Sequence, residues 1–132
     1  MKNQLKTIVM TAAMLLASPL AFAQGKSAWK ELSEFHAVMS QTFHPAEEGN
    51  LEPIRKRSAE MVEKAKAWKA SAIPADYKDI KGIEKSLDAL VDGAIKLDQR
   101  VKSGAEDAAL FSDLNALHDV FHTIVGLCRP GH

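Results

Sequence analysis

The stretch that decides the fold runs from residue 80 to residue 101 and reads IKGIEKSLDALVDGAIKLDQRV. Its apolar residues recur at steps of three and four, the spacing that gathers side chains on one face of an α-helix. The pattern predicts a long amphipathic helix that ends at Ser103 and Gly104, with the glycine as a left-handed cap. The apolar stripe comprises Ile80, Ile83, Leu87, Leu90, Ala94, Leu97 and Val101.

The segment before this helix contains two shorter ones with the same periodicity. The first is expected from Ser27 to Phe43, because the residue before Pro45 avoids helical geometry. The second is expected to begin at Asn50 as its N-cap and to end near Ala70. Their predicted core residues are Leu32, Phe35, Met39 and Phe43 in the first, and Ile54, Met61, Ala65 and Trp68 in the second.

A last helix is expected from about residue 105 to Cys128, with an apolar face of Leu110, Leu114, Leu117, Phe121 and Ile124. No segment alternates apolar and polar residues as a half-buried strand does. Four helices joined by short loops place consecutive helices antiparallel. The sequence therefore predicts an all-α fold, an antiparallel up-down-up-down four-helix bundle.

The N-terminal residues have the layout of a secretory signal peptide. Lys2 and Lys6 precede the apolar run IVMTAAMLLASPLAFA, which ends in a small-x-small cleavage pattern at residues 21–23. Residues 1–23 are therefore predicted to be a signal peptide and residues 24–132 the four-helix bundle domain. We expect a periplasmic or secreted protein with no membrane segment after cleavage, since no second apolar stretch is long enough to span a bilayer.

Charge and cysteine content exclude some functions. The chain has 17 basic and 17 acidic residues, so loss of Lys2 and Lys6 with the leader gives a net charge of −2. Nucleic acid is not an expected partner, because its binding requires a basic face. Cys128 is the single cysteine. It is a free thiol, a metal ligand or an intermolecular partner, and a homodimer through it or through shared histidines stays open.

The candidate functional residues are three histidines that the predicted bundle brings to one level. His118 and His122 are one helical turn apart, and with antiparallel end helices His36 lies level with about position 119. Neutral imidazole is a common ligand of zinc, copper and nickel. The three residues therefore predict a metal site between the first and last helices. Candidates for a fourth ligand are water, Met39, Glu60 and Asp88.

Other histidine environments leave alternatives open. His44, with Glu48 and the neighbouring carboxylates of Glu47 and Glu52, could form a weak second cation site, although a solvated acidic loop explains them more simply. The accessory candidates for the main site are Met39, His44, Glu48 and Cys128. The competing interpretation of the three main histidines is that they are hydrogen-bonding residues at the core boundary.

From the segment PADYKDIKGIEKSLDALVDGAIKLDQRVKSG (residues 74–104) through the last helix, the chain resembles the periplasmic four-helix-bundle cytochromes, the b-type bundle cytochromes and cytochrome c prime. The pair Phe121-His122 matches the position of a haem-ligating histidine in the b-type proteins. The resemblance implies haem b and electron transfer, with His122 as one axial ligand and His36 or Met39 as the other. The chain departs from this pattern by lacking CxxCH and by having His118.

Two functions follow from these observations. The first is a periplasmic protein that stores, transports or senses copper, zinc or nickel through His36, His118 and His122, with a periplasmic redox or metal-transfer partner. The alternative is a b-type haem electron carrier. We do not expect an enzyme, because a hydrolytic zinc site needs a nearby general base and none is suitably spaced on the last helix.

Overall fold

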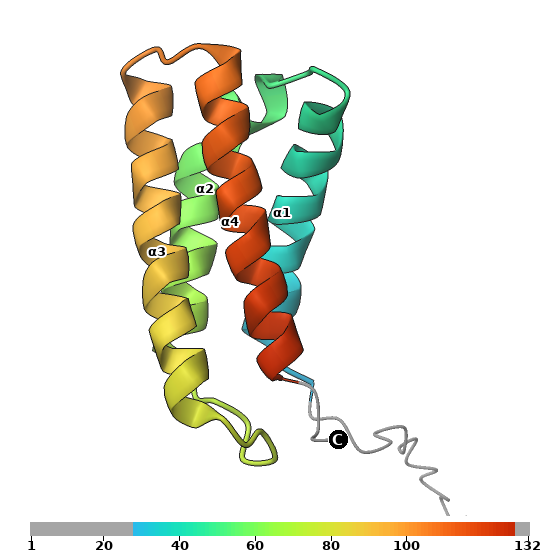
Figure 1. The fold of residues 1–132 in the computed structure, drawn as a ribbon, viewed down its shortest axis with the longest axis vertical. Coiled ribbons are helices and arrows are strands. Elements are labelled where there is room, and N and C mark those ends of the chain that lie inside the picture. The colour runs from blue at the N-terminus through green and yellow to red at the C-terminus, as the bar shows by residue number, and fades with distance from the viewer. Residues whose placement is uncertain (1–27, 129–132) are drawn as a thin grey trace, which may run out of the picture.

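Residues 28–128, the part of the chain that the computed structural model describes, form four α-helices. These are α1 (Lys30–Glu47), α2 (Glu52–Ala70), α3 (Ile80–Lys102) and α4 (Asp107–Leu127). Each helix packs against the next one along the chain, and α1 also contacts α4 (Figure 1). The predicted all-α up-down four-helix bundle is confirmed. The predicted signal peptide and its cleavage point lie outside the described residues.

The side chains that the helical periodicity selects form the core. In α3, Ile83, Leu90 and Leu97 have no exposed surface, and only the terminal stripe residues Ile80 and Val101 are half-buried. Burial of one such aliphatic side chain contributes about 1.5–3 kcal/mol, so the stripe is the main source of stability for the α3 packing. Among the other predicted core residues Leu32 is half-buried, and the rest are buried: Phe35, Met39, Phe43, Ile54, Met61, Ala65, Trp68, Leu110, Leu114, Leu117, Phe121 and Ile124.

Helix α1 continues beyond Pro45, so the predicted end at Phe43 is wrong. A proline removes one backbone N–H, but its fixed φ is compatible with a helix, and near the C-terminus little of the helix remains to be disrupted. The Pro45 carbonyl accepts hydrogen bonds from the backbone N–H groups of Glu48 (3.0 Å) and Asn50 (2.9 Å), and Gly49 has a φ of +88°. His44 therefore lies in the last turn of a helix and not in a loop.

Other helix ends differ from the prediction by a few residues. Helix α1 begins at Lys30 rather than at Ser27, because Trp29 has extended backbone geometry. The N-cap of α2 is Leu51 and not Asn50, whose Oδ1 instead accepts a hydrogen bond from the Glu52 N–H at 3.1 Å. The end of α3 is as predicted, since Gly104 follows it with a φ of +74°. Within residues 28–128, no helix combines the length and the apolar character that a bilayer-spanning segment needs.

Candidate metal centre

A groove lies between α1 and α4, where the contact between neighbouring helices is the sparsest in the bundle. Its volume is about 220 Å³. All three predicted metal ligands line it, and so do two of the accessory candidates, Met39 and His44. The complete lining consists of His36, Met39, Ser40, Phe43, His44, His118, Phe121 and His122.

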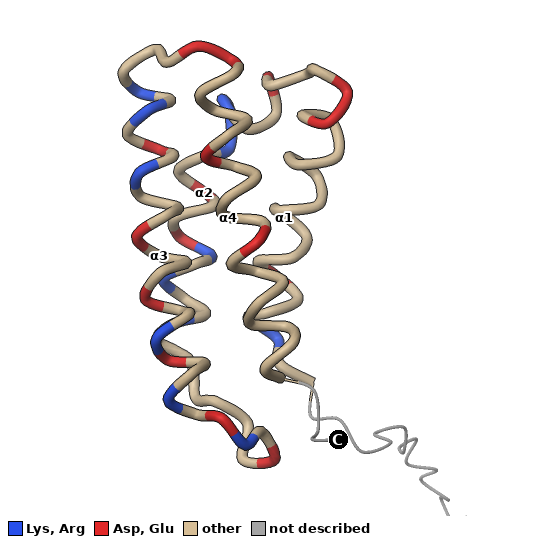
Figure 2. The backbone as a smooth tube through the Cα atoms, in the orientation of Figure 1, with Lys and Arg blue, Asp and Glu red and all other residues tan. Residues whose placement is uncertain are grey.

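The helices around this groove have few formal charges. Between Glu34 and Glu47, α1 contains no acidic or basic residue except histidine, and α4 contains only Asp119 between Asp113 and its end at Leu127. Figure 2 shows the contrast with α3, along which acidic and basic residues follow one another closely. The imidazoles are therefore the main titratable groups at this groove.

The side chains of His118 and His122 form a close pair on α4. Their Nε2 atoms are 3.1 Å apart, and the ring centroids are 4.4 Å apart with the planes at 83°. In this arrangement the Nε2–H of one neutral ring can donate a hydrogen bond to the Nε2 of the other. The same separation suits coordination, since two nitrogens bound to one tetrahedral ion at 2.0–2.1 Å are about 3.3 Å apart. The Nε2–Nε2 distance of the pair is thus close to the distance between two ligands of one metal ion.

Phenylalanine rings hold the imidazoles in place. His118 stacks on Phe43 of α1, with centroids 3.8 Å apart and planes at 8°. His36 of α1 stacks on Phe121 of α4, at 5.2 Å and 7°. Each stack joins the two helices, so the orientation of each imidazole is tied to the α1–α4 packing. The apolar periodicity predicted Phe43 and Phe121 only as core residues and gave no sign of these stacks.

Burial lowers the pKa of His118 below its usual range, and the neighbouring His122 lowers it further. The charges of Asp119 and Glu47 act in the opposite direction, and His44 adds a smaller lowering effect. The imidazole of His118 is therefore neutral at neutral pH. Neutral imidazole is the form that binds metal ions, because its free nitrogen keeps its lone pair.

Met39 also lines the groove. Its side chain is 1% exposed, in contrast to the exposed rings of His36 and His122. A thioether is a soft ligand that favours copper over magnesium or calcium. The lining of the groove therefore includes histidines and one methionine, residue types that supply nitrogen and sulfur ligands.

The remaining candidate ligands lie elsewhere. Glu60 pairs with Arg57 and Asp88 with Lys69, at 2.8 Å and 2.6 Å. Glu48 is the exposed residue that caps the end of α1. Cys128 is buried just after the end of α4, and burial raises the pKa of its thiol to about 11. None of these four residues lines the groove.

The structure pairs two of the three predicted ligands and places the third on the same groove. Within residues 28–128, no three His, Cys, Asp or Glu side chains are close enough together to hold a metal ion. His36 and His44 line the groove, but the ring of His36 stacks on Phe121, and Nδ1 of His44 lies 3.2 Å from Oε1 of Glu47. The two candidate ligands that the structure brings together are therefore His118 and His122.

Comparison of the chain with protein-family models, curated proteins and solved structures found no match. Of the expected resemblance to bundle cytochromes, the structure therefore supports only the all-α four-helix bundle of residues 28–128.

Proposed function

We propose that the protein binds a transition-metal ion, copper, zinc or nickel, in the groove between α1 and α4. The observation that supports this most directly is the 3.1 Å separation of the His118 and His122 Nε2 atoms. Such a pair is an incomplete ligand set, because a stable site normally has three or four protein ligands. His36 is the third ligand, and it reaches the ion by rotating away from Phe121. Rotation of an exposed side chain occurs within nanoseconds, so it does not limit metal capture.

The chemistry of the groove favours late transition metals over magnesium or calcium. Its donors are nitrogen and sulfur, and the hard cations require oxygen ligands. Because the pKa of His118 is lowered, this ligand stays neutral to a lower pH than an ordinary exposed histidine does, which favours retention of the metal as the pH falls. This pattern suits storage, transport or sensing of a metal ion rather than catalysis.

The cellular setting is part of the same proposal. The N-terminal leader pattern indicates export, so the metal would be captured in the periplasm or outside the cell. An exposed groove at a helix seam is open to a second protein. A periplasmic redox or metal-transfer partner would therefore reach the ion from the side of His36 and His122, which are both exposed.

Metal titration of the metal-free mature chain tests the proposal. Copper(II), zinc and nickel are each titrated by calorimetry, and bound metal is counted by elemental analysis after gel filtration. We expect about one ion per chain, and His118→Ala with His122→Ala together should abolish its binding. The matched control is Asn115→Ala with Thr123→Ala, which alters exposed residues of α4 that do not line the groove. Unchanged metal content in the double-histidine variant would refute the site.

Single variants then rank the ligands. His36→Ala should lower the affinity by about tenfold or more, equivalent to about 1.4 kcal/mol or more of binding free energy. Met39→Leu should weaken copper(I) and leave zinc almost unchanged, because zinc gains little from a thioether. If His36→Ala has no effect while His44→Ala does, His44 is the third ligand.

Haem b is the second candidate, because Met39 of α1 and His122 of α4 line one groove from opposite helices. This is the helix pairing of the ligands that the resemblance to b-type bundle cytochromes implies. The groove volume is about 220 Å³, so α1 and α4 would have to separate to admit a porphyrin. A Soret band in protein purified from periplasm without a tag would support haem, whereas bound copper or zinc without that band would support the metal site.

A further inference from the structure

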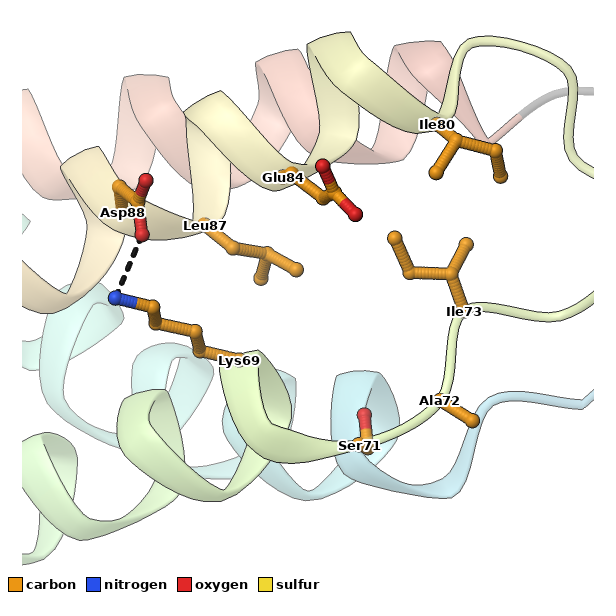
Figure 3. Close-up of a pocket in the computed structure, with 8 residues that line it drawn as sticks. All are labelled: Lys69, Ser71, Ala72, Ile73, Ile80, Glu84, Leu87 and Asp88. Carbon is orange, nitrogen blue, oxygen red and sulfur yellow. Dashed lines mark ion pairs between the residues drawn. The ribbon is translucent and has the colours of Figure 1, made fainter.

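A larger cavity lies at the other side of the bundle, between the end of α2, the α2–α3 loop and the start of α3 (Figure 3). Its volume is about 680 Å³, within the range of about 300–1,000 Å³ that is usual for small-molecule sites. It shares no residue with the α1–α4 groove. Its lining consists of Lys69, Ser71, Ala72, Ile73, Ile80, Glu84, Leu87 and Asp88.

Three aliphatic side chains give this cavity an apolar surface. Ile73 extends from the α2–α3 loop toward Ile80 of α3, and Leu87 lies between the two helices (Figure 3). Leu87 is 2% exposed, whereas Ile73 and Ile80 are half-buried. An apolar group placed against these side chains would cover the surface that they leave exposed, which is the usual source of affinity in such sites.

Most of the polar groups around the cavity already have partners. Lys69 Nζ lies 2.6 Å from Asp88 Oδ1, so these two charges neutralise each other. The Ser71 hydroxyl donates to the Trp68 carbonyl at 2.6 Å and accepts from the Trp29 indole N–H at 2.8 Å. These side chains therefore have little capacity left for a ligand.

Glu84 is the exception. Its carboxylate points toward the space between Leu87 and Ile80 (Figure 3). Among the described residues, no lysine, arginine or histidine lies within ion-pairing distance of it. The cavity thus combines an apolar surface with one uncompensated negative charge, and a ligand with the complementary properties has an apolar body and one positive charge.

We propose that this cavity binds a small amphipathic cation, an organic amine with an aliphatic or aromatic body. The body covers Ile73, Ile80 and Leu87, and the ammonium group pairs with Glu84. An anion is disfavoured, because Lys69 is already paired and the remaining charge is negative. This binding activity is separate from the proposed metal function and does not depend on it.

Isothermal titration calorimetry with three probes of equal chain length tests the ligand class. The probes are hexylammonium, hexanol and hexanoate. We expect hexylammonium to bind about two- to fivefold more tightly than hexanol, as one partly exposed ion pair allows, and hexanoate to bind least. Tryptophan fluorescence provides a second readout, because Trp29 and Trp68 both contact Ser71 at the cavity edge.

Two variants locate the site. Glu84→Gln should make hexylammonium and hexanol bind equally, whereas Glu63→Gln, an exposed glutamate of α2 outside the cavity, should preserve the preference. Ile73→Ser should weaken both probes without altering a helix, because Ile73 lies in the loop. The proposal is overturned if no probe binds saturably, if hexanoate binds best, or if Glu84→Gln leaves the preference for hexylammonium intact. Retained binding in the double-histidine variant would separate this site from the metal groove.

Discussion

Replacement of His118 by phenylalanine should separate the structural role of this ring from its chemistry. The imidazole stacks on Phe43 with centroids 3.8 Å apart, and its Nε2 faces His122 at 3.1 Å. A phenyl ring can keep the stack, but it has no nitrogen. We therefore expect His118→Phe to fold normally and to lose metal binding, whereas His118→Ala should lose both the stack and the metal.

The size of the stability effect follows from the stack. An aromatic pair contributes about 0.5–1.5 kcal/mol beyond the burial of its surface. With the loss of a half-buried ring, His118→Ala should lower the free energy of unfolding by about 1–3 kcal/mol. In a domain of about 100 residues, each kcal/mol corresponds to about 4–8 °C in Tm. His118→Phe should keep its Tm within about 5 °C of the wild-type value at neutral pH.

The pH dependence provides an independent check. Burial, together with the charge of His122, lowers the pKa of His118 in the folded state below its usual value of 6.5. The unfolded chain therefore takes up a proton at higher pH than the folded protein does. The contribution of neutral His118 to the free energy of unfolding is fully present above pH 6.5 and is lost as the pH falls through the folded-state pKa. Removing the imidazole should remove this loss, so His118→Phe should be less sensitive to acid than the wild type.

Urea unfolding of metal-free protein measures these quantities. Transitions are followed by circular dichroism and tryptophan fluorescence in the presence of a chelator, at neutral pH and near pH 5. Coincident transitions by the two probes would justify a two-state free energy. The reasoning fails if His118→Phe is as unstable as His118→Ala, or if it loses as much stability in acid as the wild type.

Three further predictions concern other parts of the bundle. Asp98→Ala should lower the free energy of unfolding in urea by about 1.5–3 kcal/mol, because the buried Ser58 hydroxyl loses its 2.8 Å acceptor, and Asp98→Asn should lower it less. Cys128 should react slowly with a disulfide reagent near pH 8 and quickly in urea, because burial raises the pKa of its thiol to about 11. Asp79→Ala should cost about 1 kcal/mol in urea unfolding, because its side chain accepts a hydrogen bond from the Gly82 N–H at the start of α3.

The helical periodicity was sufficient to predict the core but not the helix ends. Ile83, Leu90 and Leu97 are buried because the apolar stripe of a helix is most stable when it packs against the apolar stripes of other helices. Pro45 shows why the ends are harder. The rule that a helix ends before proline depends on the hydrogen bond that proline removes and on the clash of its ring with the preceding turn, and these costs affect few residues near a helix end. A rule based on local sequence therefore fails here, because the free-energy cost of a proline depends on how much of the helix follows it.

Counting residues along two antiparallel helices placed the histidines correctly along the bundle, but it could not give the directions of their side chains. The estimate that His36 lies level with about position 119 needed only antiparallel helices of equal rise, and His36, His118 and His122 do line one groove. Which ring faces which neighbour depends on rotamers and on the phenylalanines beside them. His36 rests on Phe121, while His118 and His122 face each other. The spacing of residues in a sequence does not determine these side-chain rotamers.

The cross-helix ion pairs distinguish the α1–α4 seam from the other contacts between neighbouring helices. Among the described residues, ion pairs join α1 to α2 through Glu34 and Lys64, α2 to α3 through Lys69 and Asp88, α3 to α4 through Arg100 and Asp113, and α2 to α4 through Arg55 and Asp107.

No ion pair between described residues joins α1 to α4, and the contact there is the sparsest in the bundle. The exposed rings of His36 and His122 contribute little stability, so packing accounts for the imidazole of His118 better than for these two. A metal ion held by His36 from α1 and by His118 and His122 from α4 would supply the cross-link that this seam lacks. Under the proposed function, the same ion that the protein binds would therefore also fix the packing of its two terminal helices.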